Sequence, residues 1–171
     1  MNKRVSLTVL LCVTLGVMAS HLSWVEQDNG HLLLVDAREV DVLGQAENQW
    51  VRLRRSCAGV AQLSPHDAGF QQAQAVIQAY SPPHSQSARL AGVWTTGDWT
   101  LAEVEFTQLL PAVVLLHSTG TRAEIISGAV WSGYTLPWKA APYIRRYLGA
   151  QATGVPARLL DCFEPQSEAF R

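Results

Sequence analysis

This sequence has few of the residues and patterns that usually mark chemistry. Its 171 residues include three cysteines, five histidines and two lysines, and they contain no internal repeat or low-complexity stretch. Thirteen basic residues stand against fourteen acidic ones, for a formal net charge of −1. Nucleic-acid binding proteins usually carry a strong excess of positive charge. We therefore expect no nucleic-acid partner.

No short motif identifies a metal or cofactor site. The histidines lack the i, i+4 pairing and the His-x-Glu spacing of zinc sites; they are His21, His31, His66, His84 and His117. No glycine-rich phosphate loop is present either. The sequence predicts no metal and no cofactor, and ligands distant in sequence stay open.

Two patterns come close to catalytic arrangements. Ser132 stands between Trp131 and Gly133 and misses the G-x-S-x-G nucleophile elbow by one residue. Glu103 and Glu105 share one face of a predicted strand, with side chains about 7 Å apart, and two carboxylates can hydrolyse glycosides. We interpret Ser132 as part of a surface turn and the glutamates as solvated charges on an exposed face. No catalytic residue is assigned.

Residues 1–19 have the composition of a secretory signal peptide. A short basic segment precedes an uncharged run rich in Val and Leu, Val5–Met18, and the small residue Ala19 follows. Cleavage after Ala19 fits the small-residue pattern better than cleavage after Ser20. Residues 20–171 are then predicted to form a single exported domain.

Two other fates of this N-terminal segment stay open. Without cleavage, the apolar run extends through Leu22 and Trp24 to about 20 residues, enough to cross a bilayer, and residues 5–24 would anchor the chain in the inner membrane. Alternatively, Cys12 would be lipidated, but a bulky leucine stands where lipoproteins carry a small residue. In each case the rest of the chain is extracytoplasmic, either periplasmic or secreted.

The cysteines outside the N-terminal segment number two, Cys57 and Cys162. An even number of cysteines in an oxidising compartment favours a disulfide. This one would close a loop of about 105 residues, which in the chain-entropy model contributes up to about 4–5 kcal/mol. Two free buried thiols are the alternative.

The first half of the chain predicts two strands and one main helix. A short apolar run predicts a strand at 31–36, and alternation predicts a half-buried strand at 50–54. A turn at 44–48 would join the two strands in a hairpin. Ser64, Pro65 and Asp67 resemble a capped helix start. The apolar stripe of that helix is Phe70, Ala73, Ile77 and Tyr80, and Ser81-Pro82-Pro83 ends it.

The second half predicts a sheet followed by short helices. Residues 89–131 read as a three- or four-stranded antiparallel meander with a tight hairpin at Gly97-Asp98 and a bend at Gly128. A helix near Pro142 and a last short helix, ending near Cys162, follow. The whole is an α+β fold: a curled antiparallel sheet of three to six strands on one main helix, with short C-terminal helices. This order resembles the cystatin-like and nuclear-transport-factor-2-like folds, without a specific motif.

Aromatic residues gather in the C-terminal third, beside Arg145 and Arg146. They are Trp131, Tyr134, Trp138, Tyr143 and Tyr147. Trp, Tyr and Arg are enriched where partner surfaces bind, so Trp131, Tyr134, Trp138, Arg145 and Arg146 are the candidate partner-binding residues. A plug that covers the open end of the sheet is the alternative.

Two functions are therefore expected from the sequence. The first is an exported, non-enzymatic binding or accessory protein that recognises a protein or a cell-envelope component. The second is a small envelope-acting hydrolase whose site is assembled from residues distant in sequence. A pocket holding Glu103 or Glu105 with a histidine would favour the hydrolase.

Overall fold

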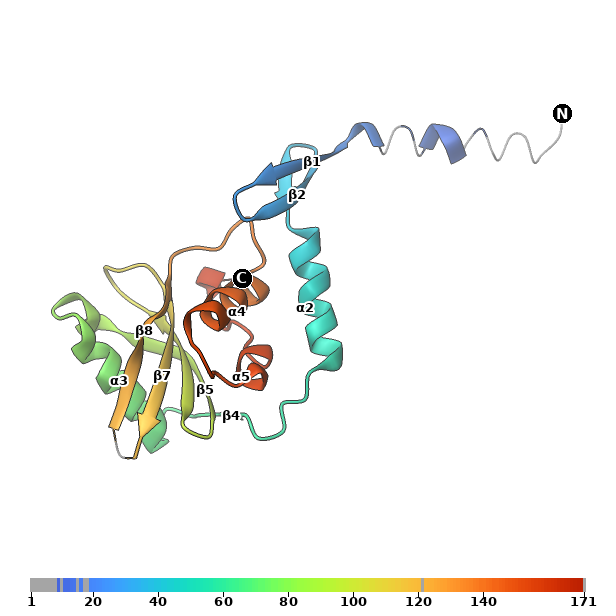
Figure 1. Ribbon diagram of the computed structural model, residues 1–171. Coiled ribbons are helices and arrows are strands. Elements are labelled where there is room, and N and C mark those ends of the chain that lie inside the picture. The colour runs from blue at the N-terminus through green and yellow to red at the C-terminus, as the bar shows by residue number, and fades with distance from the viewer. Residues whose placement is uncertain (1–8, 10, 15, 17–18, 121, 171) are drawn as a thin grey trace. The chain divides into compact units, whose positions relative to one another are not determined.

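The computed structural model describes residues 9, 11–14, 16, 19–120 and 122–170 (Figure 1). The predicted signal peptide or anchor, residues 1–19, lies mostly outside the described residues. Within the described part of the chain, no helix is both long enough and apolar enough to span a bilayer. The chain divides into two units, residues 1–46 and 47–171, and each is described by itself.

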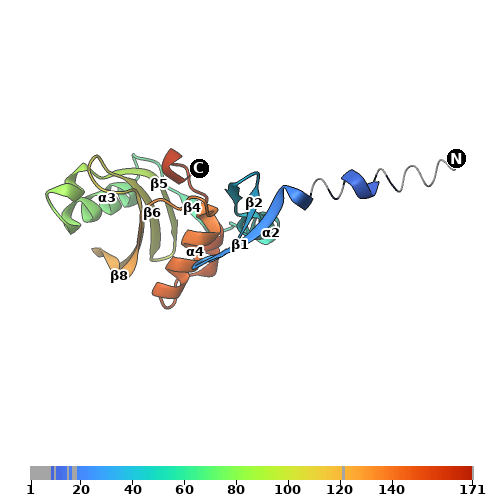
Figure 2. The ribbon, with the colours of Figure 1, turned by 90° about the horizontal axis from the view of Figure 1, so that it is seen from above.

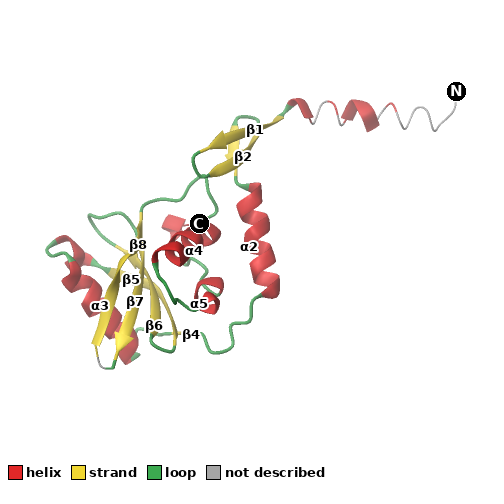
Figure 3. Cartoon of the chain, viewed as in Figure 1, coloured by secondary structure: helices red, strands yellow, loops and turns green. Residues whose placement is uncertain are grey.

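The first unit contains a three-stranded antiparallel meander (Figure 3). Its strands are β1 (Leu22–Gln27), β2 (Gly30–Val35) and β3 (Arg38–Val40). β2 confirms the predicted strand at 31–36. Its partners are the segments directly before and after it, so the predicted pairing with residues 50–54 is wrong.

The segment after β3, predicted as a turn and a second strand, is helical instead. It forms α2 (Val42–Arg54). Asp41 caps the start of this helix, because its Oδ1 accepts the Gly44 N–H at 2.7 Å. The alternation that predicted a strand covers only five residues, and it also places Trp50 and Leu53 on one helical face.

The second unit is built on a five-stranded antiparallel sheet in the order β4-β5-β6-β7-β8. Its strands are β4 (Ala61–Gln62), β5 (Arg89–Thr96), β6 (Trp99–Glu105), β7 (Ala112–Thr119) and β8 (Arg122–Ser132). The last four form the predicted meander. Gly97 has a φ of +56° in the hairpin turn, and Gly128 has a φ of +79° where the β7–β8 register shifts. Glycine adopts this left-handed backbone without steric cost.

Helices cover both faces of this sheet (Figure 2). α3 (Ala68–Tyr80) packs on one face, and α4 (Ala140–Gln151) with α5 (Ala157–Asp161) packs on the other. Because side chains alternate along a strand, Val113 enters the α4 side and Val114 the α3 side. The α+β class and the packing of the sheet on a helix are confirmed, and the short C-terminal helices form a second layer.

α3 begins after its predicted start. Asp67 Oδ2 accepts the Ser64 N–H at 2.6 Å, and these residues close a turn ahead of the helix. Tyr80, placed in the buried stripe by its spacing, is 64% exposed. The other three stripe positions are buried, as predicted: Phe70, Ala73 and Ile77.

A disulfide joins Cys57 to Cys162, as predicted, with the Cα atoms 5.8 Å apart. It links the segment after α2 to the end of α5, and it spans a sequence separation of 105 residues. Such a bond is compatible with an extracytoplasmic location.

Candidate functional site

An apolar pocket of about 310 Å³ opens beside the C-terminal end of α3. It is lined by residues of α3, the turn after it, the β6–β7 loop, β7 and β8: Ile77, Tyr80, Ser81, Ser85, Phe106, Leu109, Leu110, Ala112, Val114, Ile125, Val130 and Ser132. No charged side chain is among these lining residues. The volume lies at the lower end of the range for small-molecule sites, which are mostly apolar.

Local sequence explains how these elements leave a hollow. The Ser81-Pro82-Pro83 turn ends α3 at Tyr80, so the helix covers only part of the sheet face. The register between β7 and β8 shifts at this place. Val130 pairs with Val114, whereas Ile125, five residues earlier in β8, pairs with Leu116. The unpaired residues of the bulge widen β8 at the floor of the pocket.

Polar groups of the pocket are hydroxyls rather than charges. Ser85 Oγ donates to the Gln78 carbonyl at 2.8 Å and accepts the Ser81 N–H at 3.0 Å, so it serves the fold. Ser132 and Tyr80 are exposed residues. A peptide segment would need partners for its buried N–H and C=O groups, whereas a hydrocarbon group needs none.

The aromatic cluster predicted to bind a partner packs largely against the α4 side of the core. The Trp131 ring makes edge-to-face contacts with Tyr143, at 4.9 Å between centroids, and with Tyr147, at 5.3 Å. Trp138 stacks on Tyr143 at 6.3 Å and is half-buried. Of the five rings only Tyr134 is exposed, at 64%. Trp131 and Tyr147 pack against the core cluster, in the geometry of a plug over the core.

The two candidate arginines, adjacent in sequence, have opposite environments. Arg145 is buried and donates to the Asn48 side chain, the Phe163 carbonyl and the Glu164 carboxylate. Burial lowers the pKa of the Arg145 guanidinium from its usual value, and the Glu164 charge opposes that shift. Arg146 is exposed and pairs with Glu47 at 3.0 Å. Only Arg146 is placed to meet a partner.

Replacing these two arginines separately tests their roles. Arg145→Ala should lower the free energy of unfolding by about 2 kcal/mol, because it leaves the buried Asn48 side chain and Phe163 carbonyl without their donor. Arg146→Ala should change it by less than about 0.5 kcal/mol, since exposed ion pairs contribute little. Urea denaturation measures both values. Equal effects of the two variants would contradict the assigned environments.

The predicted carboxylate pair is split by the fold. Glu103 is fully buried, so the expectation of an exposed solvated charge is wrong for this residue. Its oxygens accept the backbone N–H groups of Gln166 and Ser167, at 2.8 and 2.9 Å. The reason is that the C-terminal segment crosses this face of the sheet and covers β6.

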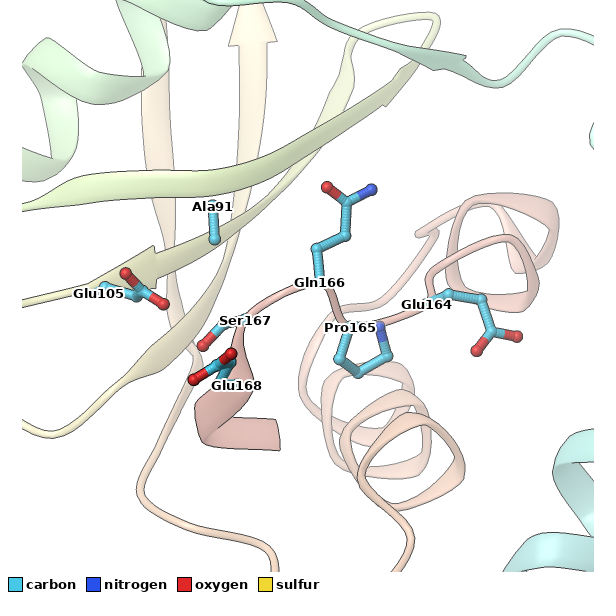
Figure 4. A pocket seen from close by; sticks show the side chains of 7 residues that line it. All are labelled: Ala91, Glu105, Glu164, Pro165, Gln166, Ser167 and Glu168. Atoms are coloured by element: carbon cyan, nitrogen blue, oxygen red, sulfur yellow. The ribbon is translucent and has the colours of Figure 1, made fainter. Parts of the chain in front are cut away.

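Glu105 instead lines an open cleft of about 610 Å³ (Figure 4). Glu164 and Glu168 also line it, and none of its lining residues is a histidine. The Glu164 side chain points away from the Glu105 side and pairs with Arg55 at 2.9 Å. Glu105 pairs with Arg89 at 3.2 Å. Both carboxylates are bound to arginines, and the histidine that would favour a hydrolase is not in this cleft.

Metal binding has no support in the described part of the chain. Among those residues, no group of three or more His, Cys, Asp or Glu side chains is placed to hold an ion. His84 Nδ1 lies 3.2 Å from the Gln108 side chain, and His117 packs against the Trp99 ring at 4.7 Å. His21 pairs with Asp36 at 2.6 Å.

The apolar pocket was not predicted from the sequence. Its walls come from several segments between Ile77 and Ser132, and apolar residues in a strand are first read as core. One signal was present: the pair Leu109-Leu110, which directly precedes Pro111 in a loop, is too apolar for an ordinary connection. These leucines are 41% and 51% exposed at the pocket.

Comparisons with protein families, with curated proteins and with solved structures find no match to this chain.

Proposed function

We propose that this chain is an exported, non-enzymatic binding protein whose α3-side pocket accepts the hydrocarbon tail of a cell-envelope molecule. The observation that carries the proposal is the pocket itself: about 310 Å³ lined by apolar and hydroxyl side chains, with no charged one. Export rests on the signal-like residues 1–19, and the Cys57–Cys162 disulfide is compatible with it.

A hydrocarbon tail fits this chemistry better than a polar metabolite does. The interior offers Ile77, Val114 and Val130 as contact surface, and the hydroxyl of Ser85 is already used by the fold. Each methylene group moved from water into such a site contributes about 0.8 kcal/mol. A polar head group would then remain at the mouth, near Tyr80 and Ser132, where solvent and hydroxyl groups are available.

The rim supports the same reading. Tyr80, Leu109 and Leu110 are large apolar or aromatic residues that are 64%, 41% and 51% exposed beside the pocket. Exposed apolar residues that gather around a cavity mark binding surfaces more reliably than single exposed ones do. They extend the apolar surface available to a tail that is longer than the pocket.

A matched pair of substitutions on β8 tests the proposal. Ser132 lines the pocket and is exposed, so Ser132→Trp should fill the mouth at little cost in stability. Ser127 is also exposed on β8 but does not line the pocket, and Ser127→Trp is the control. The probe is N-phenyl-1-naphthylamine, added to the chain purified from the extracytoplasmic fraction and displaced by saturated fatty acids of increasing length.

We expect the unmodified chain and Ser127→Trp to bind the probe alike, and Ser132→Trp to bind it at least tenfold more weakly. Displacement should strengthen with each added methylene until the pocket is full. Absence of probe binding to the unmodified chain, or equal binding by the two tryptophan variants, would refute the proposed function.

A further inference from the structure

One face of the β1–β3 meander is apolar along most of its length. Residues opposite one another in antiparallel strands point to the same face. The register pairs Leu22 with Val35, Trp24 with Leu33, and Leu33 with Val40. These five residues therefore share a face, which we call the Trp24 face.

This face is open to solvent where it is largest. Trp24 is 59% exposed and Leu22 is 42% exposed, while Leu33, Val35 and Val40 are partly exposed. Leaving such side chains in water is unfavourable, in proportion to the apolar surface that stays exposed. An apolar surface of this kind usually marks an interaction site.

The chain itself indicates what covers the face. β1 begins at Leu22, four residues after the uncharged Val5–Met18 run ends. A segment of that composition passes through a membrane during export, and where it is kept it holds β1 beside the bilayer. Tryptophan is enriched where a membrane protein meets the lipid headgroups. Of the possible partners, a bilayer is the one that this neighbouring sequence brings to the face.

Charges on the same face are ordered in a way that suits a membrane surface. Arg38 lies opposite Val35 and stands beside the Leu22 end, nearest the N-terminal segment. Glu26 and His31 lie opposite one another at the far end. A basic group beside the apolar residues can reach lipid phosphates, while the acidic group is kept away from them.

We propose that the Trp24 face rests on a lipid bilayer, with Trp24 and Leu22 inserted at the level of the headgroups. The meander then acts as a membrane-contacting platform, in addition to any hold that residues 1–19 provide. This inference is independent of the apolar pocket and of the function proposed for it. The sequence alone predicted membrane contact only through residues 5–24 of an uncleaved anchor, and the proposal adds β2 and β3 to that contact.

Tryptophan fluorescence offers a direct test. The exported chain, as its host processes it, is mixed with vesicles of phosphatidylethanolamine and phosphatidylglycerol whose acyl chains are either unmodified or brominated. Bromine quenches only those rings that reach the lipid. The chain has six tryptophans, so the Trp24 signal is obtained as the difference between the unmodified chain and Trp24→Phe. Trp50, which is 56% exposed and outside the meander, supplies the control difference through Trp50→Phe.

We expect brominated lipid to remove at least half of the Trp24 difference signal and to leave the Trp50 difference signal unchanged. If the Trp24 signal is the same in both lipids, the proposal is wrong, whatever the fate of residues 1–19.

A second pair of variants measures how much the Trp24 face contributes to the affinity of the chain for vesicles. Trp24→Asp should weaken the association of the chain with these vesicles at least tenfold in a flotation assay. Ser23→Asp, one residue earlier and on the opposite face, should change it less than twofold. If residues 1–19 are retained and hold every variant on the vesicles, the proposal is decided by the quenching of the Trp24 difference signal by brominated lipid. Where association is reversible, equal weakening by both variants would overturn the assignment of the face.

Discussion

Replacing Cys57 and Cys162 together with serine should lower the free energy of unfolding by about 4 kcal/mol. The disulfide spans a sequence separation of 105 residues, and closing so long a loop removes much of the conformational freedom of the unfolded chain. It also fastens the end of α5 to the segment after α2. Without it, the contacts between these segments include the Arg55 hydrogen bond to the Asp161 carbonyl and the ion pair of Arg55 with Glu164.

Urea denaturation under non-reducing conditions measures this change, and Ser56→Ala is the control. Ser56 is exposed and directly precedes Cys57, so its replacement should leave the midpoint unchanged. Reduction of the unmodified chain should reproduce most of the effect of the double substitution. A loss of less than about 1 kcal/mol would show that the reduced chain keeps the loop closed by other means.

The contrast between correct and wrong predictions follows the range of the interactions involved. The β5–β8 meander was predictable because hairpin turns and alternation are local signals. The strand predicted at 50–54 failed because five residues do not separate a period of 2 from a period of 3.6. The capping residue Asp41, nine residues before Trp50, carried the missing information.

The sequence of β6 alone did not indicate that the sheet face carrying Glu103 is buried. Its alternation of glutamates with apolar residues is typical of a strand with one solvated face. In the fold that face is covered by α4, α5 and the segment from Phe163 to Phe170, which lies about 60 residues further along the chain. The apolar pocket was missed for the same reason. In the sequence its lining residues look like ordinary core positions, and only the fold shows that α3 ends too early to cover them.

The candidate binding residues show what composition alone can predict. Enrichment in Trp, Tyr and Arg indicated an interface, and the same residues also build aromatic plugs and buried ion pairs. Trp131 and Arg145 serve the interior, whereas Tyr134 and Arg146 are exposed. The binding role of the exposed two stays a prediction.

Replacing Glu103 with leucine should lower the free energy of unfolding by about 3 kcal/mol. Both carboxylate oxygens of Glu103 accept backbone N–H groups of the C-terminal segment. Leucine removes the cost of holding a charge in the interior. It also removes the acceptor of a buried hydrogen bond from Ser167 and of a part-buried one from Gln166, and a buried N–H group without an acceptor costs about 1–3 kcal/mol. The second effect is larger, because the carboxylate is what holds Gln166 and Ser167 against β6.

Glu105→Leu, two residues along the same strand, is the control and should cost less than about 1 kcal/mol, since its partner Arg89 is exposed. Hydrogen exchange adds a readout that overall stability does not give. In Glu103→Leu the Gln166 and Ser167 amides should exchange faster than the amides of β6 under native conditions. Glu103→Gln keeps one acceptor oxygen, so its free energy of unfolding should lie between those of the unmodified chain and Glu103→Leu. If Glu103→Leu and Glu105→Leu are equally stable and these amides stay protected, the C-terminal segment is held by Phe163 and Phe170 packing rather than by the buried carboxylate.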